Sequence, residues 1–530
     1  MVPALSAPRD GPRGAGSTRL NGPVTSAPAT PDPALVAALR ADLTSAGYTA
    51  DAVRGAWGSL ADEAIGHGLH GPALAALGRR TDALAVLCRL LFLGAPAPRA
   101  AVDAALPSLG AEGLAALGLA DRDGDTVRAT ALVRPQDFAD ARGAGQWWIA
   151  SDLDEAAIGG ALPTGHVLGV GGASLTLAGL QLPGHAGLAL DVGTGCGIQA
   201  LRARRTVDRV VATDVSARAL AFTALNALLN DVDGIEVRLG SLFEPVAGEL
   251  FDRVVSNPPF VITPRVEGVP EYEYRDGGMA GDDLVAAFVR GVGQVLAPGG
   301  TAQLLGNWEY RTGADGLDRV REWVAASPVP LDAWVVEREL LDPLAYAELW
   351  VRDGGTAPGS PAYARLVEAW LADFADREVT AIGFGYLLLR RAEDEPTLAR
   401  YERITQGVGD ALGIHQGAAL TAWDRLARTD DEALARAVLT VADDVTEARH
   451  HLPGAEAPSV IELRQGGGFA RTVHVDPALA ALVGACDGDL PVGVLISAIA
   501  DLLEADAAAL SADLLPRVRE LLFTGFLAWG

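Results

Sequence analysis

The stretch Leu188-Ala-Leu-Asp191-Val-Gly193-Thr-Gly195-Cys-Gly197 decides the fold of the middle of this 530-residue chain. An apolar run leads directly into a glycine-rich turn, and a helix is expected from about Ile198. Glycine adopts positive φ angles and lets a ligand approach the backbone closely. A strand, a glycine-rich turn and a helix in this order predict a cradle for a nucleotide-like ligand, and a dinucleotide site would show a similar loop.

An acid follows at the end of the next predicted strand. The run Val210-Val-Ala-Thr-Asp214 places Asp214 23 positions after Asp191. That spacing fits one βαβ unit, in which an acid at this place accepts hydrogen bonds from ribose hydroxyls. Asp214 therefore predicts a ligand that contains adenosine, without separating NAD from S-adenosylmethionine.

A third motif separates these two ligands. The run Phe251-Asp-Arg-Val-Val-Ser-Asn257-Pro258-Pro259-Phe260 ends the fourth predicted strand. Proline fixes φ and lacks an N–H, so the loop is stiff and its carbonyls are free to accept, while the aromatic ring can stack on a flat substrate. The Asn257 side-chain oxygen and the Pro258 carbonyl can each accept one N–H of an NH2 group. Two such acceptors favour the pyramidal transition state of methyl transfer to a delocalised nitrogen.

Strand-like and helical runs alternate from about residue 146 to 392, which predicts an α/β domain with a mainly parallel sheet of seven strands. Ligands on such sheets bind at the carboxyl ends of the strands. The expected strands are Leu188–Val192, Arg209–Thr213, Ile235–Leu239, Asp252–Ser256, Thr301–Gly306, Leu331–Val336 and Ile382–Leu389.

The flanking segments are predicted to be mainly helical. Residues 33–145 show helical periodicity and then a hairpin turning at Asp123-Gly124, a pattern typical of a winged helix. Residues 393–530 are expected to hold a hairpin around Gly466 to Gly468 and a last helix that begins at Pro516. Such modules serve either in substrate recognition or in packing, and both readings stay open. Residues 1–32, rich in Pro, Gly, Ser and Ala, are expected to be a disordered lead-in.

Composition limits the possible partners and compartments. The formal charge of −26 opposes binding to nucleic acid unless arginines cluster, and the absence of lysine excludes a Schiff-base mechanism. Three distant cysteines, Cys88, Cys196 and Cys486, together with the absence of a secretory signal or a membrane-spanning run, indicate a cytoplasmic protein. We expect no metal site, because no cluster of His, Cys or acid shows ligand spacing.

These motifs together resemble a known family, the class I S-adenosylmethionine-dependent methyltransferases with an Asn-Pro-Pro-Phe/Tyr motif, and within it the HemK-type glutamine methyltransferases that modify release factors. Further matching stretches are Gly240-Ser-Leu-Phe-Glu-Pro245, Asp276-Gly-Gly-Met-Ala-Gly-Asp282 and Leu296-Ala-Pro-Gly-Gly300. The similarity covers about residues 160–310. It implies a Rossmann-like methyltransferase domain over residues 146–392 and S-adenosyl-L-methionine as the cofactor.

The resemblance also implies a role for each matched residue. By analogy, the target NH2 is held by Asn257, Pro258, Pro259 and Phe260, and Asn257 also contacts the cofactor. The other cofactor-binding residues would be Asp191, Gly193, Thr194, Gly195 and Gly197 in the loop, Asp214 and Val215 at the ribose, and Ser241 and Leu242 near the adenine.

The acceptor is the least constrained part of the prediction. The resemblance favours the side-chain amide of a protein glutamine, with a translation factor as one such partner. Ser241 stands where the family often has Asp, and Phe260 stands where the glutamine enzymes more often have Tyr, whereas Phe is usual in rRNA guanine N2 methyltransferases. The alternatives are therefore an exocyclic amine of RNA or DNA, such as guanine N2 or adenine N6, and a small molecule.

Overall fold

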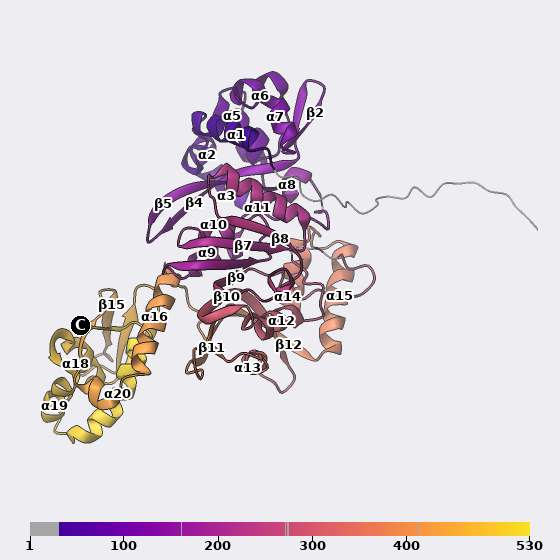
Figure 1. The fold of residues 1–530 in the computed structure, drawn as a ribbon. Helices are drawn as coiled ribbons and strands as arrows, with labels where there is room; N and C mark the ends of the chain where they lie inside the picture. The colour runs from indigo at the N-terminus through magenta and orange to yellow at the C-terminus, as the bar shows by residue number, and fades with distance from the viewer. Residues whose placement is uncertain (1–30, 161, 271, 273–274, 410) are drawn as a thin grey trace, which may run out of the picture.

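The computed structural model describes residues 31–160, 162–270, 272, 275–409 and 411–530. Figure 1 shows an N-terminal helical part, a central sheet with helices, and a C-terminal part that lies on the far side of the sheet from the N-terminal one. Apart from Asp32, which caps the first helix, the predicted lead-in lies almost wholly outside the described residues. Among the helices described, none has both the length and the apolar character needed to cross a membrane.

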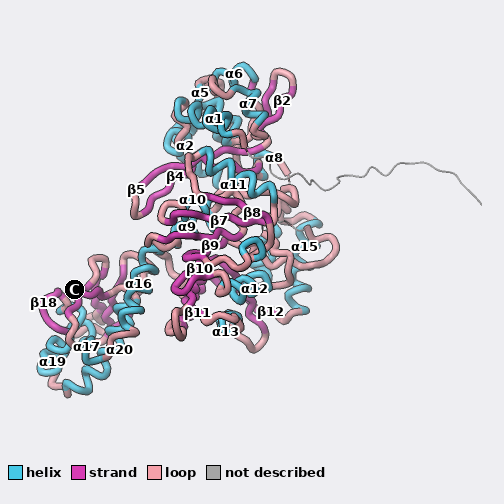
Figure 2. The backbone as a smooth tube through the Cα atoms, viewed as in Figure 1, coloured by secondary structure: helices cyan, strands magenta, loops and turns pink. Residues whose placement is uncertain are grey.

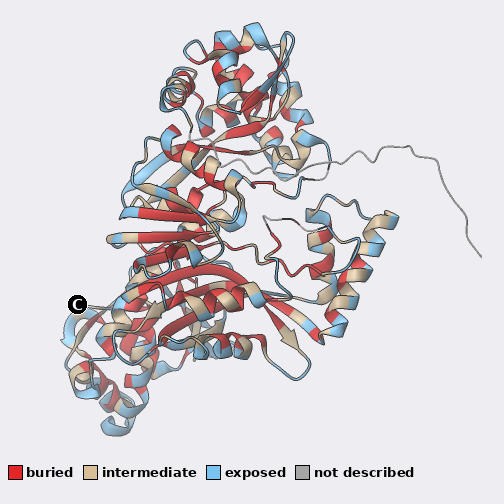
Figure 3. Ribbon diagram, turned by 45° about the vertical axis from the view of Figure 1, so that its right-hand side comes forward, coloured by how far each residue is buried: buried red, intermediate tan, exposed pale blue. Residues whose placement is uncertain are grey.

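The central sheet has the order β13-β11-β12-β10-β9-β6-β7-β8. Neighbouring strands run parallel, except that β12 is antiparallel to both β10 and β11. The buried residues in Figure 3 follow these strands, as expected for a sheet covered on both faces. The bounds are β6 (Ala186–Val192), β7 (Val207–Asp214), β8 (Ile235–Leu239), β9 (Phe251–Ser256), β10 (Leu296–Arg311), β11 (Leu331–Leu341), β12 (Val379–Arg391) and β13 (Ala399–Arg403).

All seven predicted strands are present, but the prediction of a seven-stranded sheet was wrong, because β13 adds an eighth beyond residue 392. It pairs in parallel with β11 at the edge of the sheet. Charged residues dominate β13, so it lacks the apolar signal on which the prediction rested. Ion pairs hold it instead: Glu402 pairs with both Arg400 and Arg471, and although burial opposes its charge, these arginines lower the pKa of Glu402 to about 2.

Helices cover both faces of this sheet (Figure 2). The connections between the parallel strands supply α10 (Ile198–Ala203), α11 (Ala217–Leu229), α12 (Asp283–Val292) and α13 (Gly316–Ala325), and α9 (Gly172–Leu180) precedes β6. Between β11 and β12 the chain inserts α14 (Pro343–Asp353) and α15 (Pro361–Asp376). This insertion forms an apolar cluster of its own, in which Tyr346 and Trp370 pack against Val261 and Ile262. The insertion therefore touches the chain just after the Asn-Pro-Pro-Phe motif.

The N-terminal part has the element order expected of a winged helix, an assignment that remains a proposal. A short strand and two helices precede a hairpin, and the strand pairs with that hairpin. The elements are α1 (Pro33–Ser45), α2 (Ala50–Trp57), α3 (Ser59–Gly66), α4 (Gly71–Leu77), α5 (Ala83–Leu87), a π-helical turn η1 (Cys88–Phe92), β1 (Ala97–Pro98), α6 (Arg99–Ala105), α7 (Gly110–Ala116), β2 (Ala120–Asp123) and β3 (Thr126–Ala129).

A second hairpin, β4 (Ala131–Asp140) and β5 (Gly143–Asp152), runs across the predicted boundary at residues 145 and 146. Two amides of α11 bind the backbone of β5. Asn230 Oδ1 accepts from Trp148 N, and its Nδ2 donates to Trp148 O, each at 2.8 Å. Asn226 makes the same pair of bonds to Ala150. These bonds join the N-terminal part to α11, the helix that follows β7 of the central sheet.

The C-terminal part contains the predicted hairpin as β16 and β17, with β15 as a third strand. The prediction that the last helix begins at Pro516 was wrong. Asp506 caps that helix by accepting from Ala509 N, so it begins earlier and Pro516 lies inside it. The elements are α16 (Leu412–Leu426), α17 (Asp431–Ala435), β14 (Val438–Val441), β15 (Val445–His450), β16 (Val460–Gln465), β17 (Thr472–Val475), α18 (Pro477–Ala485), β18 (Asp487–Pro491), α19 (Val492–Leu502), α20 (Ala507–Phe523) and β19 (Leu527–Trp529).

Candidate active site

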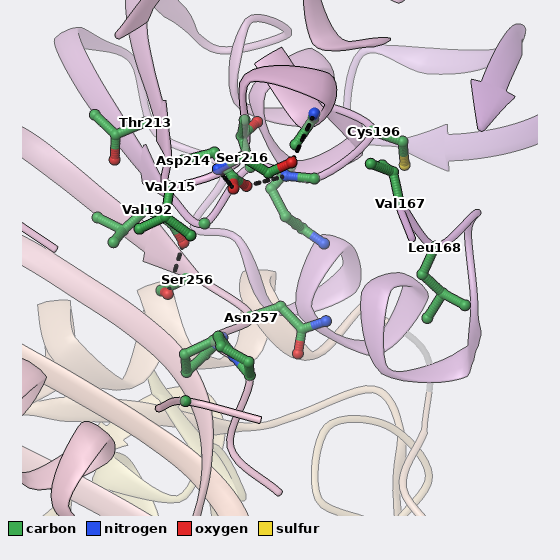
Figure 4. A pocket seen from close by; sticks show the side chains of 18 of the residues that line it. Val167, Leu168, Val192, Cys196, Thr213, Asp214, Val215, Ser216, Ser256 and Asn257 are labelled. Carbon is green, nitrogen blue, oxygen red and sulfur yellow. Dashed lines mark hydrogen bonds between the residues drawn. The ribbon is translucent and has the colours of Figure 1, made fainter. Parts of the chain in front are cut away.

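A cavity of about 430 Å³ opens at the carboxyl ends of β6, β7 and β9. Figure 4 shows Asp214, Ser256 and Asn257 around it. Most of the predicted site residues line this cavity: Gly193, Thr194, Gly195, Asp214, Val215, Ser241, Leu242, Asn257, Pro258 and Pro259. The volume lies within the range usual for sites that bind small molecules and cofactors.

The three glycines of the glycine-rich loop have different surroundings. Gly193, Gly195 and Gly197 have φ angles of +72°, +56° and +84°. A Cβ at Gly193 or Gly195 would meet nothing within 4 Å, whereas one at Gly197 would lie 3.0 Å from the Thr223 side chain. The first two glycines therefore leave open space beside the backbone. Gly197 instead allows the loop to pack closely against α11, and it does not line the cavity.

Asp191 lies behind the loop and not at the cavity surface. It is fully buried, and its Oδ2 accepts a hydrogen bond from Thr194 Oγ1 at 2.7 Å. Burial raises the pKa of Asp191 to about 7, despite the bond from Thr194. Its other oxygen has no hydrogen-bond partner in the described part of the chain. Asp191 thus supports the loop from within.

Asp214 joins the loops that follow β6 and β7. Its Oδ2 accepts from Gly195 N at 2.9 Å, and its Oδ1 accepts from Ser216 N at 2.8 Å. Each carboxylate oxygen can accept more than one hydrogen bond, so both can still receive hydroxyl groups of a ligand. The carboxylate is therefore fixed in place at the cavity.

Asn257 follows β9 directly. Ser256, the last residue of that strand, donates from Oγ to Val192 O at 2.8 Å and so ties the ends of β9 and β6 together. The Oδ1 atom of Asn257 is buried and accepts no hydrogen bond from any described residue. Such a buried acceptor is costly to leave unpaired, and unpaired buried groups are typical of functional sites.

A second cavity, of about 310 Å³, adjoins the first. The two share His166, Leu168, Asn257, Pro258 and Pro259 as lining residues, and Phe260 lines the second one only. The remaining lining residues of the second cavity are Gly68, Asp154, Glu155, Ala156, Leu162, Ala173, Val261, Arg275, Trp350 and Asp353. Asn257 and the two prolines therefore form a wall between two neighbouring spaces.

Hydrogen bonds hold the segment after the motif. Val261 N donates to Arg275 O at 2.9 Å, and Ile262 N donates to the Tyr346 hydroxyl of α14 at 2.9 Å. Thr263 donates from Oγ1 to Asp276. The motif is thus supported by the loop that precedes α12 and by the inserted helices.

Sequence reasoning missed several residues around these cavities. His166, Val167 and Leu168 line the first cavity, but their short stretch has no pattern that marks a site. Glu155 and Trp350 reach the second cavity from segments far away in the sequence. Only the folded chain brings them to the motif.

Comparisons with known proteins agree with this geometry. The family described as "Methyltransferase small domain" matches residues 171–312. Two families described only as domains of unknown function, DUF7059 and DUF7782, match residues 45–130 and 418–528.

Curated relatives match the central part of the chain. The release factor glutamine methyltransferase of Geobacter sulfurreducens is 38% identical over 127 residues, which are 22% of this chain and 44% of that protein. The ribosomal protein uL3 glutamine methyltransferase of Xanthomonas campestris pv. campestris is 35% identical over 123 residues, which are 21% of this chain and 39% of that protein. The chain therefore spans less than half the length of these relatives.

Among solved structures, the ribosomal protein L11 methylase of Lactobacillus delbrueckii subsp. bulgaricus is 17% identical to this chain, with a TM-score of 0.23. The match covers 42% of this chain and 77% of that one. A likeness this low says nothing of function. The family match carries the assignment, together with the glycine-rich loop, Asp214 and the Asn-Pro-Pro-Phe motif. Residues 171–312 are thus a class I S-adenosylmethionine-dependent methyltransferase domain that resembles the HemK-type glutamine methyltransferases.

Proposed function

We propose that the protein transfers a methyl group from S-adenosylmethionine to a planar NH2 group, and that the acceptor is the side-chain amide of a protein glutamine. One observation carries this proposal: Asn257 stands in the wall between the two cavities with a buried, unpaired side-chain oxygen. An NH2 group placed there supplies the missing donor. The names of the curated relatives, which methylate glutamine in a release factor and in a ribosomal protein, support the same acceptor.

The residues of the first cavity fit the cofactor. The open space beside Gly193 and Gly195 is a cradle that a Cβ would fill, and the fixed carboxylate of Asp214 is an acceptor suited to ribose hydroxyls. Val215 lies beside it, and Ser241 and Leu242 would hold the adenine. When bound, the cofactor supplies a methyl group activated by a sulfonium ion.

Asn257 and Pro258 orient the acceptor nitrogen. The Asn257 side-chain oxygen and the Pro258 carbonyl each accept one N–H, which turns the nitrogen lone pair toward the first cavity. S-adenosylmethionine held in the first cavity would supply its methyl carbon to this nitrogen, and the electron pair of the carbon–sulfur bond would stay on sulfur. The methylated nitrogen would then give up one proton to solvent. Alignment by a stiff Pro-Pro loop supplies the proximity contribution to the rate.

One observation favours a nucleobase as the second candidate acceptor. Phe260 and Trp350 both line the second cavity, and aromatic rings stack well on flat bases. Glu155 lines the same cavity without an ion-pair partner among the described residues, and such a carboxylate disfavours a phosphate beside it. The glutamine acceptor therefore fits the cavity better.

The test is transfer of labelled methyl from S-adenosylmethionine into the protein and RNA fractions of a cell lysate, with Asn257→Ala as the control. We expect label in protein that depends on Asn257, and mass spectrometry of the labelled band should place the methyl group on a glutamine. Label confined to RNA would instead support the nucleobase acceptor.

A further inference from the structure

The second cavity is built largely from parts of the chain outside the matched domain. Gly68 comes from the N-terminal part, Asp154 and Glu155 from the segment after β5, and Trp350 and Asp353 from the end of α14. The match to methyltransferase small domains, at residues 171–312, covers none of these. Segments outside the matched domain therefore contribute part of the lining of this cavity.

Two of the three carboxylates in the cavity form ion pairs with arginines. Asp154 pairs with Arg134 and lies 3.6 Å from His70 Nε2, and although burial opposes its charge, these neighbours hold the pKa of Asp154 well below its usual range. Asp353 accepts from Arg275 Nη1 at 2.9 Å. Both charges are thus balanced within the protein.

Glu155, at the start of α8 (Glu155–Ile158), is the exception. It forms no ion pair with any residue that the structure describes. Burial raises the pKa of Glu155, and the nearby carboxylate of Asp353 raises it further, while Arg275 acts in the opposite direction. A carboxylate beside other carboxylates, without a cation of its own, is stabilised when a ligand brings a positive charge.

Buried polar atoms that lack hydrogen-bond partners in the described chain include three from the lining residues that matter here: Glu155 Oε1, Asn257 Oδ1 and Trp350 Nε1. The first two are acceptors and the indole N–H is a donor. A polar atom buried without a partner destabilises the protein until a ligand supplies that partner. A ligand that offers N–H groups and a carbonyl would satisfy all three, and a peptide has both.

We propose that the second cavity binds a peptide in which a cationic group, a guanidinium or an ammonium, lies next to the glutamine to be methylated, and that Glu155 is the residue that recognises this cation. Trp350 donates to a carbonyl of the same peptide. The inference rests on the proposed function, since it takes a glutamine amide as the group held by Asn257. The net charge of −26 favours the approach of a basic peptide and opposes that of a nucleic acid.

The test uses synthetic peptides with one central glutamine flanked by Arg, Ala or Glu, and the full chain with S-adenosylmethionine. Methylation is followed by mass spectrometry for the wild type, for Glu155→Gln and for a control, Asp121→Asn, an exposed acid on β2 far from the cavity in sequence. We expect the wild type to prefer Arg-flanked over Ala-flanked peptides by about tenfold or more in kcat/KM, as a hydrogen-bonded charge pair provides. Glu155→Gln should reduce this ratio to about one, and Asp121→Asn should preserve it.

The outcomes separate this inference from the proposed function. Methylation of the glutamine peptides without preference for Arg, or with a preference that survives in Glu155→Gln, would overturn the inference and leave the proposed function standing. If no glutamine peptide is methylated while the same enzyme labels RNA, the proposed function fails, and the inference fails with it.

Discussion

Asn226 binds Ala150 as a neighbouring β-strand would: its Oδ1 accepts from Ala150 N at 2.7 Å and its Nδ2 donates to Ala150 O at 2.9 Å. The same Nδ2 donates to Cys196 O, in the glycine-rich loop, at 2.8 Å. Asn226 is fully buried. A single amide of α11 therefore connects the hairpin of the N-terminal part to the wall of the cofactor cavity.

Replacing Asn226 by Ala should destabilise the protein more than replacing Asn230. The first change leaves the buried backbone groups of Ala150 and Cys196 unpaired, whereas Asn230 is only half-buried and contacts Trp148. We expect Asn226→Ala to lower the free energy of unfolding by about 2–4 kcal/mol. Thermal unfolding of the full chain measures this, and equal midpoints for the two variants would argue against the connection.

Asp214→Ala should weaken cofactor binding. The change removes the acceptor of the Gly195 and Ser216 N–H groups as well as the acceptor proposed for the ribose. We expect the Kd for S-adenosylmethionine to rise by about tenfold or more. Asp208→Asn, at the exposed start of the same strand, is the matched control and should bind as the wild type does. Unchanged affinity in Asp214→Ala, measured by calorimetry, would undercut the ribose assignment.

Two glycines of one loop should respond differently to alanine. A Cβ at Gly195 enters open space and so should obstruct the cofactor, while a Cβ at Gly197 meets Thr223 at 3.0 Å and should strain the fold. Both positions have positive φ, so each change also costs about 1 kcal/mol of backbone strain. We expect Gly195→Ala to show the larger loss of cofactor affinity and Gly197→Ala the larger fall in thermal midpoint. The reverse pattern would contradict the separate roles of the two glycines, in which Gly195 leaves space for the cofactor and Gly197 allows close packing.

Asp191 should make stability depend on pH. The pKa of Asp191 rises from 3.8 to about 7 on folding. Its contribution to the free energy of unfolding is therefore fully present below about pH 4 and is lost as the pH rises through 7. Asp191→Asn cannot ionise. As the pH is raised, the free energy of unfolding of the variant should therefore increase relative to that of the wild type, by up to about 4 kcal/mol. Urea unfolding of both proteins without cofactor at about pH 5 and pH 8 measures this difference, and parallel profiles would rule out the buried neutral carboxyl.

The sequence predicted the elements whose signal is local. The apolar strands, the glycine-rich loop, Asp214 at a strand end and the Asn-Pro-Pro-Phe motif all lie close to where the patterns placed them. These patterns arise because a buried parallel strand needs a continuous apolar run and because a tight turn needs glycine.

The remaining features depend on contacts between distant segments. Strand β13 is charged and held by ion pairs with residues as far away as Arg471, so it carries no strand pattern. Asp191 lies next to the glycines in the sequence, yet it belongs to β6 and its side chain is buried in the core. The second cavity needs Glu155, from the segment after β5, and Trp350, from the inserted helix α14, and only the folded chain brings both of them to Phe260.

The central claim is that Asn257 contributes to the reaction by holding the acceptor, beyond any contact that it makes with the cofactor. Asn257→Ala removes the unpaired oxygen at the wall between the cavities. The most direct test compares wild type and variant in two measurements: transfer of labelled methyl to the protein acceptor, and the Kd for S-adenosylmethionine by calorimetry. We predict a loss of transfer of about a hundredfold or more, as for other groups that stabilise a transition state, with a Kd that stays within a few-fold of the wild-type value. Transfer at the wild-type rate by Asn257→Ala would contradict the account.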